Sequence, residues 1–435
     1  MPALTRRSLL LSSAGLATLP LLNACGGTAA SPSGSAGSAT LAFSFWGPAF
    51  YQNFTKQMVD LFMKKNPNIT VTSQPAEWGS YWDKLATMVA GKHAPDVINM
   101  DGKYLADYGG RGILADLSTL KGIDLSSLSE ADKQAGTWDG KLYALTTGSN
   151  AFSVFANPSI LAKAGVSMPD DSTWTWDDLL SISKTVSQKV GGGVVGVTGG
   201  GSYADLTIFL RQHGEDLYSK NGAGFTPETC AKWLQWFLDA QDSGATFSAD
   251  KATEDGNASY EQQAFATNRS AFFWSWTNQL GDARKTSGHD DITMLRPPST
   301  DGKAKDNGLF LKASMFWSIA STTKYPEAAA AFVNFLLNDP DAAQIQLVNR
   351  GVPSSPAALK AMESKLTPTD KDVIAWLKKV SPEISSAPAI QPKGTSDFQS
   401  SIARELSNVR FKKTTPIQSA TTLKQTLDSM AAKGQ

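Results

Sequence analysis

The chain of 435 residues has little cysteine, little histidine and no net charge. Its two cysteines, Cys25 and Cys230, exclude the disulfide framework of a small secreted domain. Three scattered histidines do not form a metal cluster or an acid–base relay, so neither a metal nor a cofactor is expected. Forty basic residues balance forty acidic ones, which argues against a nucleic-acid-binding protein. No P-loop and no Gly-x-Ser-x-Gly elbow occurs.

Apolar and aromatic residues are plentiful instead. Hydrophobic residues make up 41% of the chain and charged residues 18%, a composition that supports buried cores and excludes disorder over most of its length. The length predicts two to three compact units. Twelve tryptophans are many for such a chain, and an exposed indole ring is costly unless it meets a flat apolar surface.

The first 24 residues are predicted to be a signal peptide. Arg6 and Arg7 precede an uncharged stretch, residues 8–22, that is too short to span a bilayer of about 30 Å. The arginine pair resembles the twin-arginine export signal, and the segment 22–25, Leu-Asn-Ala-Cys, resembles a bacterial lipobox. The resemblance implies that Cys25 is lipidated; an ordinary cleaved signal with an incidental cysteine is the alternative.

A flexible tether is predicted to follow the lipidated cysteine, over residues 25–39. Residues 26–39 carry no charge and no aromatic ring, so nothing in them can be buried. Such a coil spans roughly 20 Å and would hold a folded domain just outside the cytoplasmic membrane. The second cysteine, Cys230, follows helix-start signals and is expected to be a buried helical thiol.

The mature chain shows an alternation of strands and helices. Strands are expected at Leu41–Trp46, Ile69–Ser73 and Asp96–Met100, with helices between them. The alternation resumes after residue 150 and includes a helix expected at Ser259–Thr267, and the tail is expected to be helical with proline breaks. This pattern predicts an α/β fold with mostly parallel sheets.

Several motifs in one order resemble a known family. They are Ala94-Pro-Asp-Val-Ile-Asn-Met-Asp101, the hairpin Trp138-Asp-Gly-Lys-Leu-Tyr-Ala-Leu145, Thr173-Trp-Thr-Trp-Asp-Asp-Leu179 and Arg350-Gly-Val-Pro353. Together they resemble the family 1 extracellular solute-binding proteins of bacterial sugar ABC importers, the group that includes the maltose-binding protein. The chain departs from the family pattern at Thr146, Ala156 and Asn268-Arg269.

The resemblance implies a two-lobed periplasmic-binding-protein fold that closes on its ligand like a flytrap. Residues 40–152 plus about 318–365 would form one lobe, and residues 153–317 plus about 366–435 the other. The chain would cross between the lobes near 151–156, near 313–319 and around 366. The implied protein is not an enzyme. It would be a monomer, held on the outer face of the cytoplasmic membrane by its lipid anchor, that delivers a sugar to permease subunits.

The expected ligand-binding residues follow from strand ends and from the resemblance. Open α/β sheets bind ligands at the carboxyl ends of their strands, and a sugar needs flat rings for its C–H faces and polar groups for its hydroxyls. The candidates are Trp46, Tyr51, Glu77, Trp78, Asp101, Asn150, Tyr203, Trp274, Trp276, Asn278, Trp317 and Arg350. Phe316, next to Trp317, is expected to face the cleft as well.

Two alternatives to a sugar-binding protein stay open at this point. A secreted carbohydrate hydrolase or lyase would need two carboxylates about 5–10 Å apart, and only Glu77 and Asp101 suggest themselves. A binding protein for another solute, such as a polyamine or a peptide, would keep the fold and change the ligand.

Overall fold

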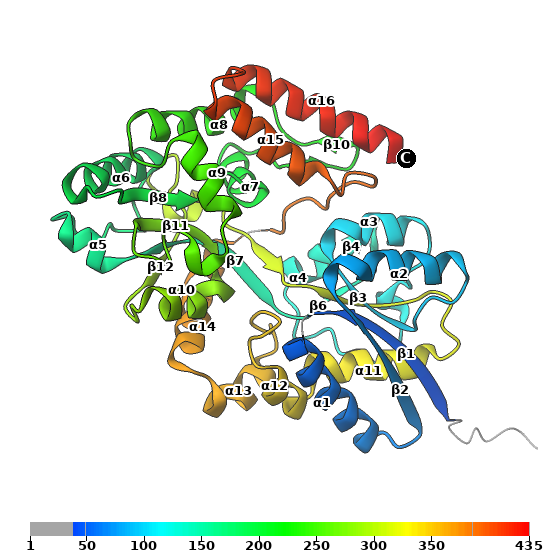
Figure 1. Ribbon diagram of the computed structural model, residues 1–435. Helices are drawn as coiled ribbons and strands as arrows, with labels where there is room; N and C mark the ends of the chain where they lie inside the picture. Colours follow the sequence, from blue (N-terminus) through cyan, green and yellow to red (C-terminus); the bar gives the residue numbers. More distant parts are fainter. Residues whose placement is uncertain (1–37, 48, 385, 435) are drawn as a thin grey trace, which may run out of the picture. The chain divides into compact units, whose positions relative to one another are not determined.

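The computed structural model describes residues 38–47, 49–384 and 386–434 (Figure 1). The predicted signal peptide, Cys25 and nearly all of the tether lie outside the described residues. Among the described residues, no helix combines the length and the apolar character needed to cross a membrane.

The first of two large sheets has the strand order β2-β1-β3-β14-β6. It contains β1 (Ala39–Trp46), β2 (Ile69–Ala76), β3 (Val97–Met100), β14 (Phe316–Ile319) and β6 (Leu145–Thr146). β1 pairs in parallel with β2 and β3, whereas β14 runs antiparallel to both β3 and β6. All four residues of β3 and of β14 are buried, as expected for strands covered on both faces.

Helices cover both faces of this first sheet. On one face α1 (Ala49–Lys65) and α11 (Pro326–Asn338) pack against the phenylalanines of β1. On the other face α2 (Trp78–Ala90) and α3 (Gly102–Gly110) pack against β3. We call this sheet with its helices the first lobe (Figure 1).

The second large sheet has the order β12-β7-β11-β8, with β13 also paired to β7. It contains β7 (Ser149–Ala156), β8 (Val195–Gly199), β11 (Ser270–Trp276), β12 (Thr293–Leu295) and β13 (Leu311–Ala313). We call this sheet with its helices the second lobe. Those helices are α5 (Pro158–Lys163), α6 (Trp176–Val190), α7 (Tyr203–Arg211), α8 (Pro227–Asp242), α9 (Ala249–Asn257), α10 (Leu280–Ser287), α14 (Pro368–Val380), α15 (Phe398–Arg410) and α16 (Pro416–Gly434).

Both sheets are mixed, which corrects the expectation of mostly parallel sheets. In the second sheet only β8 and β11 are parallel, and β7 is antiparallel to β11, β12 and β13. The antiparallel strands β7 and β14 each follow directly after a strand of the other sheet: β7 follows β6, and β14 follows β13. The predicted alternation of strands and helices in an α/β fold is nevertheless confirmed.

The chain passes between the sheets at closely packed points. β6 leads through Gly148 into β7, and β13 leads into β14. At the first of these points the backbone of Ser149 pairs with Val352, which lies between α12 (Pro340–Gln346) and α13 (Pro356–Met362). The predicted lobe boundaries stay a prediction. The two sheets have separate hydrophobic cores, and the residues of each core come from stretches of chain similar to those predicted for each lobe.

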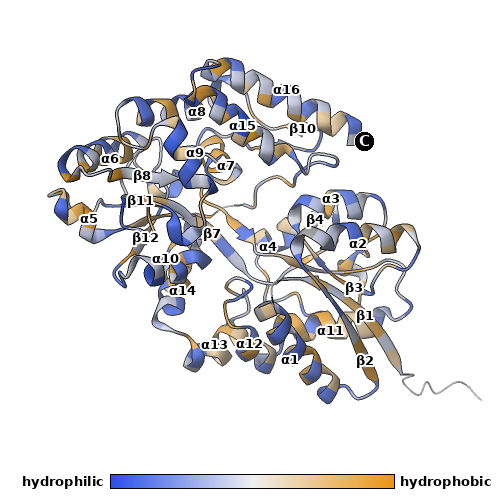
Figure 2. Ribbon diagram, in the orientation of Figure 1, coloured by the Kyte–Doolittle hydropathy of each residue, from blue (hydrophilic) through white to orange (hydrophobic). Residues whose placement is uncertain are grey.

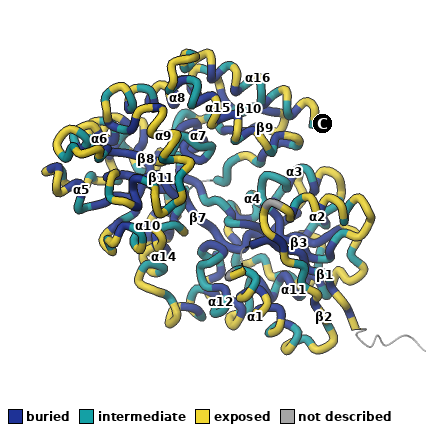
Figure 3. The backbone as a smooth tube through the Cα atoms, viewed as in Figure 1, coloured by how far each residue is buried: buried dark blue, intermediate teal, exposed yellow. Residues whose placement is uncertain are grey.

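Local sequence signals explain several element ends. Thr175 and Asp178 form a capping box at the start of α6, and Thr367 and Asp370 form another at α14. Along the outer helices hydrophilic and hydrophobic residues are interspersed, and so are exposed and buried residues, as in amphipathic helices (Figures 2 and 3). The hairpin expected around Asp139-Gly140 is confirmed, with positive φ at both turn residues.

The helix expected at Ser259–Thr267 is wrong. Only a short 3-10 turn forms, at Tyr260–Gln262, followed by further turns. The carboxylate of Asp255 accepts a hydrogen bond from the backbone N–H of Ala264 (2.6 Å). The backbone N–H of Ala264 thus donates to a side chain and not to the carbonyl four residues earlier, as it would in a helix.

Candidate ligand-binding cleft

A cavity of about 260 Å³ is lined by residues of both lobes. Its walls come from the loops that follow β3, from the start of α2 and α7, from β13 and β14, and from the segment that leads into α15. Its lining residues include Trp78, Asp101, Lys103, Tyr203, Tyr218, Phe310, Lys312, Phe316 and Gln399. A solute in this cavity would touch both lobes at once.

The first lobe supplies Trp78 and Asp101 at the carboxyl ends of its parallel strands. Asp101 follows β3 and is the N-cap of α3, where its Oδ1 accepts a hydrogen bond from the backbone N–H of Lys103 (3.0 Å). Trp78 follows β2 by two residues and begins α2. The cavity therefore lies at the edge of this sheet that the strand-end rule selects.

Trp78 stands at the front of an aromatic cluster. It is 41% exposed, whereas Trp46 behind it is 8% exposed. The two rings meet edge to face at 5.1 Å, and Trp82 contacts both of them. Tyr104 packs on Trp82 at 3.8 Å. The cluster holds Trp78 in place while leaving its ring available to a ligand.

The second lobe supplies Tyr203 through a glycine-rich turn. Residues 199–201 are three glycines with φ of 69 to 74°, a left-handed conformation that suits glycine. Ser202 and Asp205 then form a capping box, and Asp205 accepts a hydrogen bond from the indole N–H of Trp233 (3.0 Å). This arrangement fixes Tyr203 at the first position of α7.

The electrostatics of the cavity keep its tyrosines neutral. Burial raises the pKa of Tyr203, and the charge of Asp101 in the other lobe raises it further. Burial also raises the pKa of Tyr218. The hydroxyl of Tyr218 is buried and has no hydrogen-bond partner among the described residues. It is therefore available to donate a hydrogen bond to a ligand.

Three candidates are corrected, because their side chains lie in the cores. Trp274 is 3% exposed, stacked between Phe152 at 5.7 Å and Trp176 at 5.4 Å. Trp317 is fully buried and packs on Phe43. In a strand, neighbouring side chains point to opposite faces, so Phe316 reaches the cavity and Trp317 does not.

Arg350 is the third correction. Its side chain is fully buried and donates hydrogen bonds to Thr55 Oγ1 (3.0 Å) and Asn99 Oδ1 (3.2 Å), and it also contacts the sulfur of Met315. Its guanidinium lies 5.1 Å from the centre of the Trp317 ring. Burial lowers the pKa of Arg350 to about 10. The residue braces the first lobe from inside.

The other candidates lie near the cavity or elsewhere on the protein. Tyr51 donates a hydrogen bond to the carbonyl of Asn349 (2.6 Å). Asn150 is buried in β7, while Glu77 and Asn278 are exposed and do not line the cavity. Trp276 is half-buried beside the cavity wall, with the ammonium of Lys312 5.6 Å from its ring centre.

Sequence reasoning missed several lining residues of the second lobe. Phe310 and Lys312 lie just before the expected crossing at 313–319, so extending that segment by three residues would have found them. The wall at residues 387–391 carries no motif that signals a site. Among the described residues, no group of three potential metal ligands comes together.

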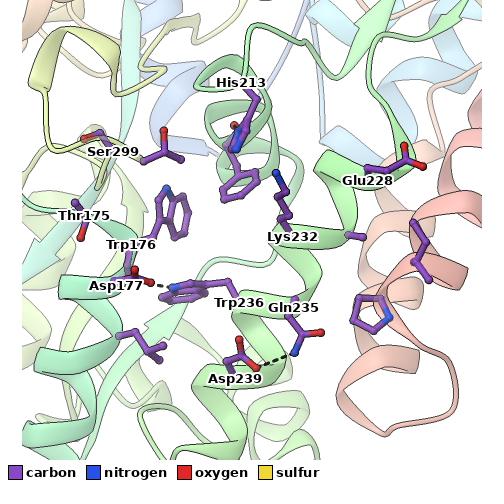
Figure 4. A pocket seen from close by; sticks show the side chains of 16 residues that line it. Thr175, Trp176, Asp177, His213, Glu228, Lys232, Gln235, Trp236, Asp239 and Ser299 are labelled. Atoms are coloured by element: carbon purple, nitrogen blue, oxygen red, sulfur yellow. Dashed lines mark hydrogen bonds between the residues drawn. The ribbon is translucent and has the colours of Figure 1, made fainter.

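A larger hollow of about 590 Å³ lies on the second lobe alone (Figure 4). It is lined from α6, α7, α8, the loop at 299–300 and the start of α16. Its two indole N–H groups are already used: Trp236 donates to the carbonyl of Trp176 (3.0 Å), and Trp176 donates to Gln212 (2.9 Å). It involves only one lobe, so closure of the lobes would not change it.

Comparison with known proteins agrees with this geometry. The family model described as "Bacterial extracellular solute-binding protein" matches residues 57–375, more than half of the chain. The chain belongs to this family. A solved extracellular solute-binding protein of family 1 from Alicyclobacillus acidocaldarius is 27% identical, with a TM-score of 0.75, over 92% of this chain and 100% of that one. The two-lobed periplasmic-binding-protein fold is thereby confirmed.

Two relatives of this solute-binding protein carry more specific names. The arabinooligosaccharide-binding protein of Bacillus subtilis is 30% identical over 49% of this chain and 50% of its own length. The diacetylchitobiose binding protein DasA of Streptomyces coelicolor is 25% identical over 65% of each chain. The matches thus span about half and just under two thirds of these relatives. As the family's description implies, the protein binds a solute outside the cytoplasm.

Proposed function

We propose that this solute-binding protein captures a saccharide between its lobes and delivers it to the permease of an ABC importer. The observation that carries the proposal is the exposed ring of Trp78 on the wall of a cavity that both lobes form. A pyranose presents an apolar C–H face to such a ring and hydroxyl groups to Asp101, Tyr203 and Tyr218. The names of the two relatives, for an arabino-oligosaccharide and for diacetylchitobiose, support a saccharide.

Closure of the lobes would supply the affinity. A ligand favours the closed form only if it binds that form more tightly than the open one. Trp78 and Asp101 belong to the first lobe, and Tyr203 and Tyr218 to the second, so only a closed cleft engages all four. We assign residues 40–152 and about 318–365 to the first lobe, and residues 153–317 and about 366–435 to the second.

The remaining parts of the proposal concern the cell surface. The twin-arginine-like signal and the lipobox suggest export followed by lipidation of Cys25, with a tether of about 14 residues. The protein would act as a monomer on the outer face of the cytoplasmic membrane, beside its permease. A mature mass without lipid on Cys25, measured from a membrane fraction, would contradict the anchor.

The cavity favours binding over hydrolysis. A glycosidase needs two carboxylates that flank the bond to be cleaved. Among the described residues Asp101 is the only carboxylate that lines the cavity, and Glu77 faces solvent. The same shortage of acids argues against a polyamine. The one arginine expected in the site, Arg350, lies in the core, so no guanidinium among the described residues lines the cavity for a peptide carboxylate.

Isothermal titration calorimetry with mono- and oligosaccharides, polyamines and short peptides tests the proposal. We expect one saccharide series to bind and to be recovered intact. Trp78→Ala should weaken binding at least about tenfold, because a stacked ring is lost. Tyr325→Ala removes a similarly exposed ring (39%) that precedes α11 and does not line the cavity, so it is the matched control. Cleaved sugar, or binding of amines or peptides alone, would overturn the proposal.

A further inference from the structure

Lys312 has an unusual place in the cleft. It lies on β13 next to the crossing into β14 and lines the cavity. Its ammonium lies over the ring of Trp276, 5.6 Å from the ring centre, and makes one long hydrogen bond to the carbonyl of Ala313 (3.4 Å). Among the described residues, no carboxylate oxygen lies within 4.0 Å of it. Among the described residues, the ammonium of Lys312 is therefore met by a ring face and one long hydrogen bond to a carbonyl, and by no carboxylate.

The charged groups on the cavity wall do not cancel. Only three of the described residues that line it are charged: Lys103, Lys312 and Asp101. Lys103 lies in the first lobe, with its ammonium over the rings of Trp78 (5.0 Å) and Tyr104 (4.8 Å). It is also close in sequence to Asp101, whose carboxylate it contacts through its backbone N–H. The wall therefore carries two ammonium groups and one carboxylate, and Lys312 is the charged group that the second lobe contributes.

A carboxylate on the ligand would bind Lys312 more strongly than the ring does. A cation over an exposed aromatic face gains less than an ammonium that donates a charge-assisted hydrogen bond to a carboxylate. The lysine side chain is long and has several rotatable bonds, so its ammonium can leave the ring without moving the backbone. That movement would also uncover the ring of Trp276 for the C–H face of a sugar.

We propose that the ligand of this cleft is an acidic saccharide, with a uronic-acid carboxylate bound by the ammonium of Lys312. This inference rests on the proposed saccharide function and specifies its chemical class. Trp78 stacks on one ring of the ligand, Tyr218 donates to an oxygen of the ligand, and Lys312 selects the acid. Neutral saccharides of the same size cannot make this contact, so the ammonium of Lys312 stays over the ring of Trp276.

Paired ligands test this proposal on the full protein. Oligogalacturonates, oligoglucuronates and oligomannuronates of two to four units are titrated beside the neutral oligosaccharides of the same length and linkage. We expect one acidic series to bind about tenfold or more tightly than its neutral counterpart, the effect of one charge-assisted hydrogen bond. Raising the salt from about 0.05 to 0.5 M should weaken only the acidic series, because the contact is between charges.

Two variants identify the residue that selects the acid. Lys312→Met keeps the apolar stem and removes the charge, so it should abolish the preference for the acid while retaining the affinity for the neutral sugar. Lys312→Arg should restore the preference. Lys103→Met removes the other ammonium of the cavity wall and is the matched control. It should reduce the preference less, because Lys103 lies over Trp78 and Tyr104 on the first lobe and is not the group that contacts the ligand carboxylate. An unchanged thermal unfolding midpoint shows that each variant is folded.

The outcomes separate this inference from the proposed function. Neutral saccharides that bind as tightly as the acidic ones, or a preference that survives in Lys312→Met, would overturn the inference and leave saccharide capture standing. If no saccharide binds, acidic or neutral, the proposed function fails, and the inference fails with it.

Discussion

Gly148 and Gly351 pack backbone against backbone where the chain crosses between the lobes. A Cβ atom on Gly351 would lie 2.6 Å from the carbonyl carbon of Gly148, and a Cβ on Gly148 would lie 2.5 Å from the carbonyl oxygen of Gly351. The adjacent residues Ser149 and Val352 exchange two backbone hydrogen bonds. The segment that joins the two sheets at Gly148 is thus fixed to the segment between α12 and α13 with no side chain between them.

This contact predicts that Gly351→Ala destabilises the protein by roughly 2–4 kcal/mol, from left-handed strain at a φ of 86° together with the overlap. Gly112→Ala is the matched control, because Gly112 also has a positive φ (71°) but nothing within 4 Å of its Cβ position. Urea denaturation measures both. Equal losses would mean that the close approach of the two glycines adds nothing.

Trp274 and Trp78 should respond in opposite ways to replacement by alanine. Trp274→Ala removes a ring packed between two others and should lower the free energy of unfolding by about 3–5 kcal/mol. Trp78→Ala should cost about 1 kcal/mol, since the ring is partly in solvent, yet reduce ligand affinity more. Chemical denaturation together with calorimetry separates the two effects. A stable Trp274→Ala protein that has lost binding would restore Trp274 as a ligand residue.

Asp255 predicts a pH dependence of stability. Burial raises the pKa of its carboxyl, so the folded protein holds the proton more tightly than the unfolded chain. Stability from this group therefore falls as pH rises from about 4 through the raised pKa. Asp255→Asn should gain stability relative to the wild type between about pH 4 and pH 7.

Asp250 is the control for this pH dependence. Its exposed carboxyl accepts a hydrogen bond from Ser248, which lowers its pKa. Above about pH 5 it is ionised in both states, and nearer pH 4 its lowered pKa acts with the opposite sign. Asp250→Asn should therefore not gain stability relative to the wild type as the pH rises. Urea unfolding at about pH 4 and pH 7 measures the difference in stability between each variant and the wild type. A flat profile for Asp255→Asn would contradict the raised pKa.

Cys230 should report global unfolding. The residue is fully buried in α8, as its helix-start context predicted, and burial raises the pKa of its thiol to about 12. Thiolates are the reactive form, so an alkylating reagent should label Cys230 only when α8 opens. Labelling of a Cys25→Ser protein, followed by peptide mass analysis, should speed up with urea in step with the unfolding equilibrium. Rapid labelling in native buffer would contradict the buried position.

The sequence predicted the fold well because the fold depends on periodic patterns. Apolar strands, amphipathic helices and caps repeat along the chain, and the rule about strand ends located Trp78 and Asp101. The helix expected at Ser259–Thr267 failed because one side chain, Asp255, competes for a backbone N–H. Such a competition depends on a contact that a local pattern does not contain.

The candidate site was harder to predict, because it depends on which face of a strand each ring occupies and how far along the strand it lies. Phe316 and Trp317 are neighbours, and a one-residue difference sends the first to the cavity and the second to the core. Trp274 and Trp276 are two residues apart in β11 and so share a face, yet Trp274 lies in the core while Trp276, the last residue of the strand, is only half-buried. Lys312 acquires its role only from the pairing of distant segments.

The position of β14 in the middle of the first sheet constrains the order of folding. This strand lies between β3 and β6, and Asn99 reaches across 217 residues of chain to bond to the carbonyl of Phe316. Until residue 319 has been synthesised, the first sheet lacks an inner strand, although its four other strands all come from the first 150 residues. Contacts of such long range form slowly and leave strand edges open to misassembly meanwhile. The half of the protein that is made first is therefore completed only after all five strands of the second sheet have been made.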